Sequence, residues 1–299
     1  MTMPWNYEAV ADQSGRVAIV TGANTGLGFE TAKGLAAKGA DVVMACRNAE
    51  KAQAAADKIR ADVPGAKLHL YDLDLASLAS VRAFADKVLT DFDRIDLLIN
   101  NAGVMMSPRF ETEDGLEGQT GVNFIGHFAL TQHLLDRVVA TAGSRIVQLS
   151  SQAHRFGQIN LRDFQFKKSY NPIVAYGQSK LACLIFMYEL DRRFKAQGIS
   201  TLSVAAHPGA SSTDLPRHLP KFAQGLAPYI AQSPYHGAQP TLYAALGDDV
   251  NSGEYFGPDG LFEQAGKAVK VGSMRKARDE QMAKKLWEIA EDLSGVKML

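Results

Sequence analysis

Residues 17–28 read Val-Ala-Ile-Val-Thr-Gly-Ala-Asn-Thr-Gly-Leu-Gly. The first four residues are typical of a buried strand, and a helix-compatible run over 29–38 follows the last glycine. Glycines at such a turn let the backbone bend sharply and let a ligand approach closely, while the free N–H groups of the next helix face a bound anion. We therefore predict a phosphate cradle rather than an ordinary strand-to-helix turn, made by Gly22, Asn24, Thr25, Gly26, Leu27 and Gly28.

The composition fits one globular domain and argues against several classes of protein. With 299 residues, 46% apolar and 21% charged, the chain can bury a large core. Its 32 basic and 32 acidic side chains cancel, so nothing favours a nucleic-acid partner. Cys46 and Cys183 match no disulfide or metal spacing, and no apolar run reaches the roughly 20 residues of a membrane span. We expect a cytoplasmic protein without a metal site, with a leader over 1–15 and one domain over 16–299.

The residue after the second predicted strand, 41–46, bears on the choice of dinucleotide. A carboxylate at this point binds a ribose diol and repels a 2′-phosphate, whereas an arginine accommodates the phosphate. This chain has Arg47 there and no acid. Arg47 predicts a preference for the phosphorylated cofactor, the alternative being a solvated charge at a strand end.

Two more strands are predicted over 67–73 and 96–99, and polar residues follow each of them. Asp74 either caps the next helix or contacts the adenine amine, or does both. The fourth strand opens onto Asn-Asn-Ala-Gly, small residues that let the backbone pass close to a ribose. The candidate cofactor residues at these two strand ends are Asp74, Leu75, Asn101, Ala102 and Gly103.

A long helix over 118–140 carries Asn123 among apolar residues. Because a buried amide needs hydrogen-bond partners, Asn123 is either functional or a packing amide at a kink. A fifth strand over 144–149 leads to Ser151, at the sheet edge where open α/β folds bind their ligands.

Tyr176 and Lys180 lie one helical turn apart on the same face of a predicted helix. A free tyrosine, with a pKa near 10, is a poor acid–base group at neutral pH, and a neighbouring cation favours its phenolate form. A nearby serine hydroxyl would hold a carbonyl oxygen while the phenol donates its proton. Such a pair is commonly structural when it occurs alone, but here it follows the phosphate cradle and the polar strand ends.

The helix continues through an apolar run over 181–187 that needs covering on more than one side. Together with the 118–140 helix it predicts a subunit interface, and hence a homodimer or homotetramer, the alternative being burial against the protein's own sheet.

A sixth strand over 199–206 is followed by three candidate cofactor residues near the nicotinamide. His207 is interpreted as a packing residue, because no acid or nucleophile pattern accompanies it. The apolar, proline-containing segment over 210–240 is the predicted substrate lid. A helix at 240–245, a strand at 253–257 and a helix at 275–293 are expected to complete the domain. The three candidates are Pro208, Gly209 and Thr213.

In this order the motifs resemble those of the classical short-chain dehydrogenases/reductases, over residues 15 to about 260. Finer features at 45–47, 150–154 and 207–209 resemble the branch that contains the retinol dehydrogenases and their bacterial relatives. The resemblance implies an α/β Rossmann fold, a doubly wound parallel sheet of about seven strands flanked by helices, and NADP(H) as the cofactor. The interval between Ser151 and Tyr176 is longer than in most of the superfamily, as in that branch, so 154–173 is an added segment near the site.

The resemblance also implies a catalytic set. In it Tyr176 exchanges the proton with the substrate, Lys180 favours the ionised phenol and binds the nicotinamide ribose, Ser151 orients the substrate oxygen, and Asn123 holds a water that links Lys180 to solvent. We expect an NADP(H)-dependent oxidoreductase acting on a small hydrophobic alcohol, aldehyde or ketone. The alternatives are a non-catalytic dinucleotide-binding sensor or scaffold, and a dehydratase or epimerase that uses Asp214 or His218.

Overall fold

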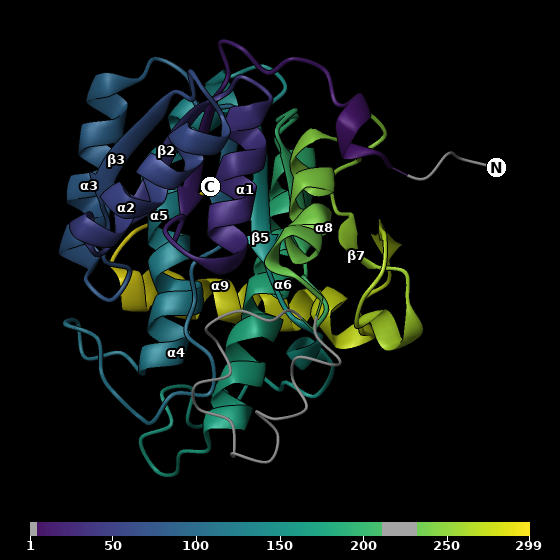
Figure 1. Ribbon diagram of the computed structural model, residues 1–299. Coiled ribbons are helices and arrows are strands. Elements are labelled where there is room, and N and C mark those ends of the chain that lie inside the picture. Colours follow the sequence, from purple (N-terminus) through teal and green to yellow (C-terminus); the bar gives the residue numbers. More distant parts are fainter. Residues whose placement is uncertain (1–4, 211–231) are drawn as a thin grey trace.

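The computed structural model describes residues 5–210 and 232–299, which form a central sheet with helices on both faces (Figure 1). In these residues eight strands follow the order β3-β2-β1-β4-β5-β6-β7-β8, and all neighbours are parallel except β7 and β8. The predicted doubly wound parallel sheet is confirmed, and β8 is an antiparallel edge strand that the sequence analysis missed. The strands are β1 (Val17–Thr21), β2 (Asp41–Cys46), β3 (Leu68–Asp72), β4 (Leu97–Asn100), β5 (Arg145–Leu149), β6 (Leu202–Ala206), β7 (Tyr255–Pro258) and β8 (Ala268–Val271).

Helices alternate with the strands, and most of them begin at a residue whose side chain caps the first turn. Asn48, Ser77 and Asn171 each accept a hydrogen bond from a backbone N–H of the first turn that follows, which satisfies a donor that the helix leaves unpaired. The helices are α1 (Gly26–Ala37), α2 (Ala49–Asp62), α3 (Leu78–Asp91), α4 (Gly118–Thr120), α5 (Gly126–Ala140), α6 (Pro172–Ala196), α8 (Pro234–Leu246) and α9 (Glu280–Ser294).

Two hydrophobic cores lie on opposite faces of the sheet. Successive residues of β1 alternate between them, with Ile19 packing under α3, α5 and α6, and Val20 under α1, α2 and α8. Because both faces are covered, the inner strands β1, β2, β4 and β6 are largely apolar rather than alternating with polar residues. This burial accounts for the continuous apolar runs from which the strands were predicted.

The order in which the strands are added changes direction between β1 and β4, which are parallel neighbours. The chain proceeds from β1 to β3 toward one edge of the sheet, and from β4 to β8 toward the other. Parallel strands place their carboxyl ends at one edge, and the crevice at such a switch point is where open α/β sheets bind ligands. The loops that follow β1, β2, β4, β5 and β6 therefore meet at one end of the molecule. These loops carry most of the predicted site residues.

The helix predicted over 118–140 has a break in it. A π-helical turn, Gly121–Ile125, separates α4 from α5, so the run is helical throughout but not regularly α-helical. At the carboxyl end, α9 begins at Glu280 and not at Arg275, because a separate 3₁₀ turn occupies Arg275–Arg278. The helix expected at 240–245 is the second half of α8, which contains Pro240.

The outer faces of α5 and α6 are covered by α9, which crosses them (Figure 1). Trp287 packs on Phe128 and Phe186, with ring centroids 5.2 and 5.7 Å apart, and the Arg193 guanidinium lies 3.8 Å from its ring centroid. The apolar surface that predicted a subunit interface is therefore buried within the chain. The alternative interpretation named burial against the sheet, and the structure adds α9 as the cover on the outer side.

The described part of the leader, residues 5–15, is anchored by aromatic contacts. Trp5 stacks on Tyr243 of α8 with centroids 5.1 Å apart, and the Tyr7 hydroxyl donates to Gly34 O at 2.7 Å. Among the described helices, none is long and apolar enough to cross a membrane. Over the same residues, His, Cys, Asp and Glu side chains form no group of three or more suited to hold a metal ion.

Candidate active site

The loop from β1 into α1 leaves a helix N-terminus open to a ligand. Thr25 precedes the helix in an extended conformation, with φ −157°, and its side chain makes no capping hydrogen bond. The first turn contains no acidic residue. Gly22 and Gly26 turn the chain with φ values of +67° and +56°, which favour glycine. Backbone N–H groups at this end therefore suit an anion such as a diphosphate.

Gly28 is required because the loop and helix approach each other closely. A Cβ at this position would lie 2.3 Å from Gly22 O and 2.5 Å from Asn101 Nδ2. Contacts this short displace backbone, so the cradle and the turn after β4 pack together only with glycine at position 28. The cradle thus has the chemistry to hold a phosphate-bearing ligand, because the first turn of α1 carries no acidic residue.

The Thr21 side chain ties the cradle to the turn after β4. Its Oγ1 accepts hydrogen bonds from Asn101 N and Ala102 N, both at 2.9 Å, and its carbonyl oxygen accepts one from Asn101 Nδ2 at 2.7 Å. The turn that was predicted to pass a ribose is thus held against β1 by three hydrogen bonds from two consecutive residues.

His127 extends this network into α5. Its Nδ1 donates to Asn123 O at 3.0 Å, since a carbonyl oxygen only accepts, so its Nε2 accepts from the Thr21 hydroxyl at 2.9 Å. Burial lowers the pKa of His127 to about 4, which keeps the ring neutral. Sequence reasoning missed this histidine, although its position four residues after Asn123 in an apolar helix was a signal.

Asn123 lies in the π-helical turn, and its amide is held on three sides. Nδ2 donates to Val104 O and Ser179 Oγ, both at 2.9 Å, and Oδ1 accepts from Val104 N at 2.8 Å. The kink of the alternative interpretation is present. π-turns are nonetheless frequent at functional sites, and this one places the amide beside the turn after β4.

Tyr176 and Lys180 meet the other elements from α6. Lys180 Nζ donates to Leu149 O at 3.0 Å and lies 5.9 Å from the centroid of the Tyr176 ring. Gly103 approaches from the turn after β4, where a Cβ would lie 3.4 Å from Lys180 Nζ and 3.0 Å from Asn123 Oδ1. Both Tyr176 and Lys180 are 6% exposed. Four predicted site residues from three separate segments therefore meet at one point.

Ser151 is brought into the same corner by its neighbour. Ser150 Oγ donates to Lys180 O at 2.8 Å, which fixes the end of β5 against α6. Ser151 is half-buried and caps a short 3₁₀ helix, Gln152–Arg155, by accepting from Ala153 N at 3.2 Å. Its hydroxyl hydrogen is not used in that bond and is available to a substrate oxygen.

Arg47 and Asp74 lie together at the ends of β2 and β3. Arg47 Nη1 is 3.9 Å from Asp74 Oδ2, and the Arg47 side chain is 73% exposed. Asp74 does not cap α3; Ser77 does, while Asp74 Oδ1 accepts from Ala76 N in the loop before it. The capping interpretation of Asp74 is therefore wrong, because the helix begins three residues later than that interpretation requires.

The loop after β6 is held by a charged partner. His207 is fully buried, its Nε2 lies 3.0 Å from Glu263 Oε2, and Gly209 N donates to its Nδ1 at 3.2 Å. These bonds fit the packing role, and Glu263 is an acidic partner that no pattern in the sequence indicated. Residues 211–231 lie outside the described residues, and with them most of the predicted lid, Thr213, and the alternative acid–base groups Asp214 and His218.

The added segment over 154–173 is anchored beside the site. Gln178 of α6 accepts from Asn160 N and donates to Phe164 O, both at 2.9 Å. The Tyr170 hydroxyl donates to Ser107 O at 2.8 Å. The segment therefore connects the start of α6, just before Tyr176, to the chain that follows the turn after β4.

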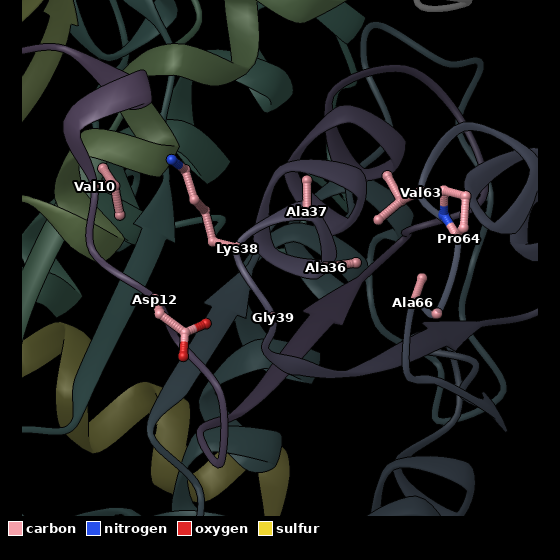
Figure 2. A pocket seen from close by; sticks show the side chains of 10 residues that line it. Val10, Asp12, Ala36, Ala37, Lys38, Gly39, Val63, Pro64 and Ala66 are labelled. Atoms are coloured by element: carbon pink, nitrogen blue, oxygen red, sulfur yellow. The ribbon is translucent and has the colours of Figure 1, made fainter.

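A cavity of about 420 Å³ lies elsewhere, at the amino ends of the strands (Figure 2). It is bounded by the leader, the end of α1 and the loop between α2 and β3, and small residues line much of it. Lys38, on its wall, donates to Glu8 O. Because the predicted site residues lie at the carboxyl ends of the strands, this cavity is no part of the candidate site.

A family model described as short chain dehydrogenase matches residues 16–223. Retinol dehydrogenase 13 of Homo sapiens is 43% identical over 294 residues, covering 95% of this chain and 86% of that protein. Retinol dehydrogenase 11 of Homo sapiens is 41% identical, covering 94% and 86%.

Solved structures are similar as well. The crystal structure of an uncharacterized protein from Mycobacterium paratuberculosis aligns with a TM-score of 0.83 and 40% identity, and covers 99% of both chains. A short chain dehydrogenase from Escherichia coli CFT073, complexed with NADPH, aligns with a TM-score of 0.66 over 84% of this chain and 98% of that one. At 23% identity the second match bears on the fold alone.

Proposed function

The chain belongs to the short chain dehydrogenase family, in the branch that contains the retinol dehydrogenases, and from that premise we propose that it is an NADP(H)-dependent oxidoreductase. In this proposal it transfers a hydride between the nicotinamide and an apolar alcohol, aldehyde or ketone. The observation that carries the proposal is the convergence of Tyr176, Lys180, Asn123 and Gly103 at one point beside an open helix N-terminus.

Tyr176 is the proposed acid–base group. In the reducing direction its hydroxyl donates a proton to the substrate oxygen, which the Ser151 hydroxyl orients, and in the oxidising direction the phenolate accepts that proton. The bound cofactor supplies or accepts the hydride. Lys180 donates to Leu149 O with one of its three N–H groups, and we propose that the others bind the nicotinamide ribose and favour the phenolate.

We propose that Asn123 holds a water through which Lys180 exchanges protons with solvent. An amide oxygen accepts two hydrogen bonds, and Val104 N supplies one of them to Oδ1. We assign the other to a water that exchanges protons with Lys180. The hydrogen bonds to Val104 and Ser179 fix the orientation of the amide, so that its oxygen and not its nitrogen faces Gly103 and Lys180.

The preference for NADP(H) is assigned to Arg47. Its exposed guanidinium is paired with Asp74 at only 3.9 Å, and such surface pairs contribute about 0–1 kcal/mol. A doubly charged 2′-phosphate competes well with one carboxylate for this group, because planar guanidinium binds phosphate through two parallel hydrogen bonds. Asp74 and Leu75 are then placed beside the adenine, and Asn101 and Ala102 beside the adjacent ribose.

The substrate is proposed to be apolar. Ile173 and Val174, in the first turn of α6 ahead of Tyr176, are 49% and 47% exposed, and Leu161 of the added segment is 40% exposed. Exposed apolar side chains in the turn before Tyr176 and in the added segment suit a substrate with a hydrocarbon body. The names of the retinol dehydrogenases point to the same class of alcohol for this chain.

The variant Tyr176→Phe tests the proposal. With NADP⁺ and retinol, or with NADPH and a straight-chain or aromatic apolar aldehyde, we expect kcat to fall by about 10²–10⁴-fold, the usual contribution of a general acid–base group. Cofactor affinity, measured by calorimetric titration, is expected to stay within about threefold, since the ring remains. Tyr235 is an exposed tyrosine of α8, and the variant Tyr235→Phe serves as the control. Equal turnover in Tyr176→Phe would refute the role of Tyr176 as the acid–base group. Wild-type protein that binds neither NADPH nor NADH would refute the proposal that the chain is a nicotinamide-dependent enzyme.

A further inference from the structure

The turn between β7 and β8 is held in an unfavourable backbone conformation. Phe262 and Glu263 have φ values of +51° and +56°, a region that residues with a Cβ rarely adopt. Such a conformation is unfavourable and persists only where the surroundings impose it. Burial does not impose it here, because Leu261 and Phe262 are 80% and 78% exposed.

The Glu263 carboxylate supplies the restraint. Its Oε2 accepts from Gln152 Nε2 at 2.8 Å and from His207 Nε2 at 3.0 Å, and its Oε1 accepts from Arg155 Nη2 at 2.7 Å. The hydrogen bond from His207 is the largest cause that lowers the pKa of Glu263 to about 2, so the carboxylate is ionised. One side chain thus joins three loops.

Two of these loops belong to the proposed active site. Gln152 directly follows Ser151, and Arg155 ends the 3₁₀ helix that Ser151 caps. On the other side, His207 directly precedes the pair Pro208–Gly209. Glu263 therefore connects the loop that orients the substrate oxygen to the loop predicted to lie beside the nicotinamide.

His207 links Gly209 to Glu263, and only one tautomer of its ring can make both hydrogen bonds. Gly209 N donates to Nδ1, so Nδ1 carries no hydrogen, and Nε2–H donates to Glu263. Burial lowers the pKa of His207, which keeps the ring in this neutral form. Gly209 also packs on the same turn, where a Cβ would lie 2.3 Å from Gln264 O, and Ala210 N donates to that oxygen at 2.7 Å.

We propose that Glu263 is a positioning residue that fixes the Ser151 loop relative to the Pro208–Gly209 loop. It thereby sets the separation between the substrate-orienting hydroxyl and the nicotinamide end of the cofactor. The inference rests on the function proposed above and adds to it a residue of the β7–β8 turn that touches neither substrate nor cofactor.

Two ligands separate this role from a general effect on folding. NADPH carries the nicotinamide, whereas 2′-phospho-ADP-ribose retains the adenosine and diphosphate but lacks it. In Glu263→Gln one accepting oxygen is replaced by an NH₂ group, which then faces the N–H donors of Gln152, Arg155 or His207. We therefore expect NADPH to bind about 10- to 100-fold more weakly, as for loss of a charged hydrogen bond. Binding of 2′-phospho-ADP-ribose is expected to stay within twofold. The same substitution on the exposed face of α9, Glu288→Gln, is the matched control.

A second variant tests the Ser151 side alone. Gln152→Leu removes one donor to Glu263 and leaves the His207 bond to Gly209 in place. We expect kcat to fall about 10-fold or more with NADPH affinity unchanged, whereas Glu263→Gln lowers both.

The proposal is overturned if Glu263→Gln leaves NADPH affinity and kcat unchanged, or if it weakens NADPH and 2′-phospho-ADP-ribose equally. It is also overturned if Gln152→Leu leaves kcat unchanged. Failure of wild-type protein to bind either ligand is a different result, because it contradicts the proposed function before any variant of Glu263 is compared.

Discussion

Arg47 is the single residue on which the proposed choice of cofactor depends. It stands where a ribose-binding acid would favour NAD(H), and its guanidinium is free to turn toward a 2′-phosphate because its contact with Asp74 is long and exposed. One charged hydrogen bond contributes about 1.5–3 kcal/mol, which corresponds to roughly 10- to 100-fold in affinity.

Arg47→Asp is therefore expected to weaken NADPH by about 10- to 100-fold while NADH binds equally well or better. Calorimetric titration of both cofactors measures the change in preference. Arg60→Asp, at the far end of α2, changes the net charge of the chain equally and is expected to leave the preference as it is. A preference for NADPH that survives in Arg47→Asp would remove Arg47 from the site.

At the residue scale the sequence analysis found the groups that belong to local motifs. Tyr176 and Lys180 share one helical turn, and Asn101 and Gly103 share one strand end, so spacing alone relates them. The sequence analysis could not identify hydrogen-bond partners that are far apart in the chain. Thr21 and His127 are 106 positions apart, and His207 and Glu263 are 56 apart, and no periodicity connects such pairs.

At the scale of elements, the position of α1 against the turn after β4 is the most demanding feature of the cradle. Gly28→Ala would place a methyl group within 2.3 Å of Gly22 O, a backbone atom that moves only with the whole loop. We expect loss of detectable NADPH binding together with a fall in the midpoint of thermal unfolding. Gly272→Ala, where no atom lies within 4 Å of the added methyl group, is expected to change neither. Normal cofactor affinity in Gly28→Ala would show that the cradle is not where the diphosphate binds.

Strands buried on both faces were predictable because their apolar runs are continuous. The short edge strand β8 was missed, since its four residues pair on one side only and carry a weak pattern. At Asn123 the sequence indicated a possible kink, but neither the π-turn nor its bounds. The Asn123 side chain is hydrogen-bonded to Val104 and Ser179, which are distant in sequence, and a helical periodicity does not encode such contacts.

At the scale of the whole molecule, α9 occupies the surface that predicted an interface between subunits. The sequence showed correctly that the outer faces of α5 and α6 need cover, but it did not show what provides it. Trp287 and Leu286, more than 90 residues further along the chain than the apolar run of α6, supply that cover. The apolar faces of α5 and α6 therefore give no basis for a homo-oligomer in this chain.

Acid is expected to destabilise the whole fold over a pH window set by its buried histidines. Burial lowers the pKa of His127 and of His154 to about 4, against about 6.5 in the unfolded chain. Between these values the unfolded state binds more protons, so stability is complete above about pH 6.5 and is lost as the pH falls toward 4. Each histidine contributes a slope of at most about 1.4 kcal/mol per pH unit. The lowered pKa of Glu263 adds a separate loss only below its usual pKa of about 4.5.

Urea unfolding between pH 7.5 and pH 4.5, followed by tryptophan fluorescence, measures this dependence. Whatever its effect on stability at neutral pH, His127→Gln removes one titrating group, so its slope is expected to be flatter by about one proton. His236→Gln, at an exposed position at the start of α8, is the control for replacing a histidine by glutamine. A wild-type stability that does not change over this range, or equal flattening in the two variants, would mean that the buried network of Thr21, His127 and Asn123 does not hold a neutral imidazole.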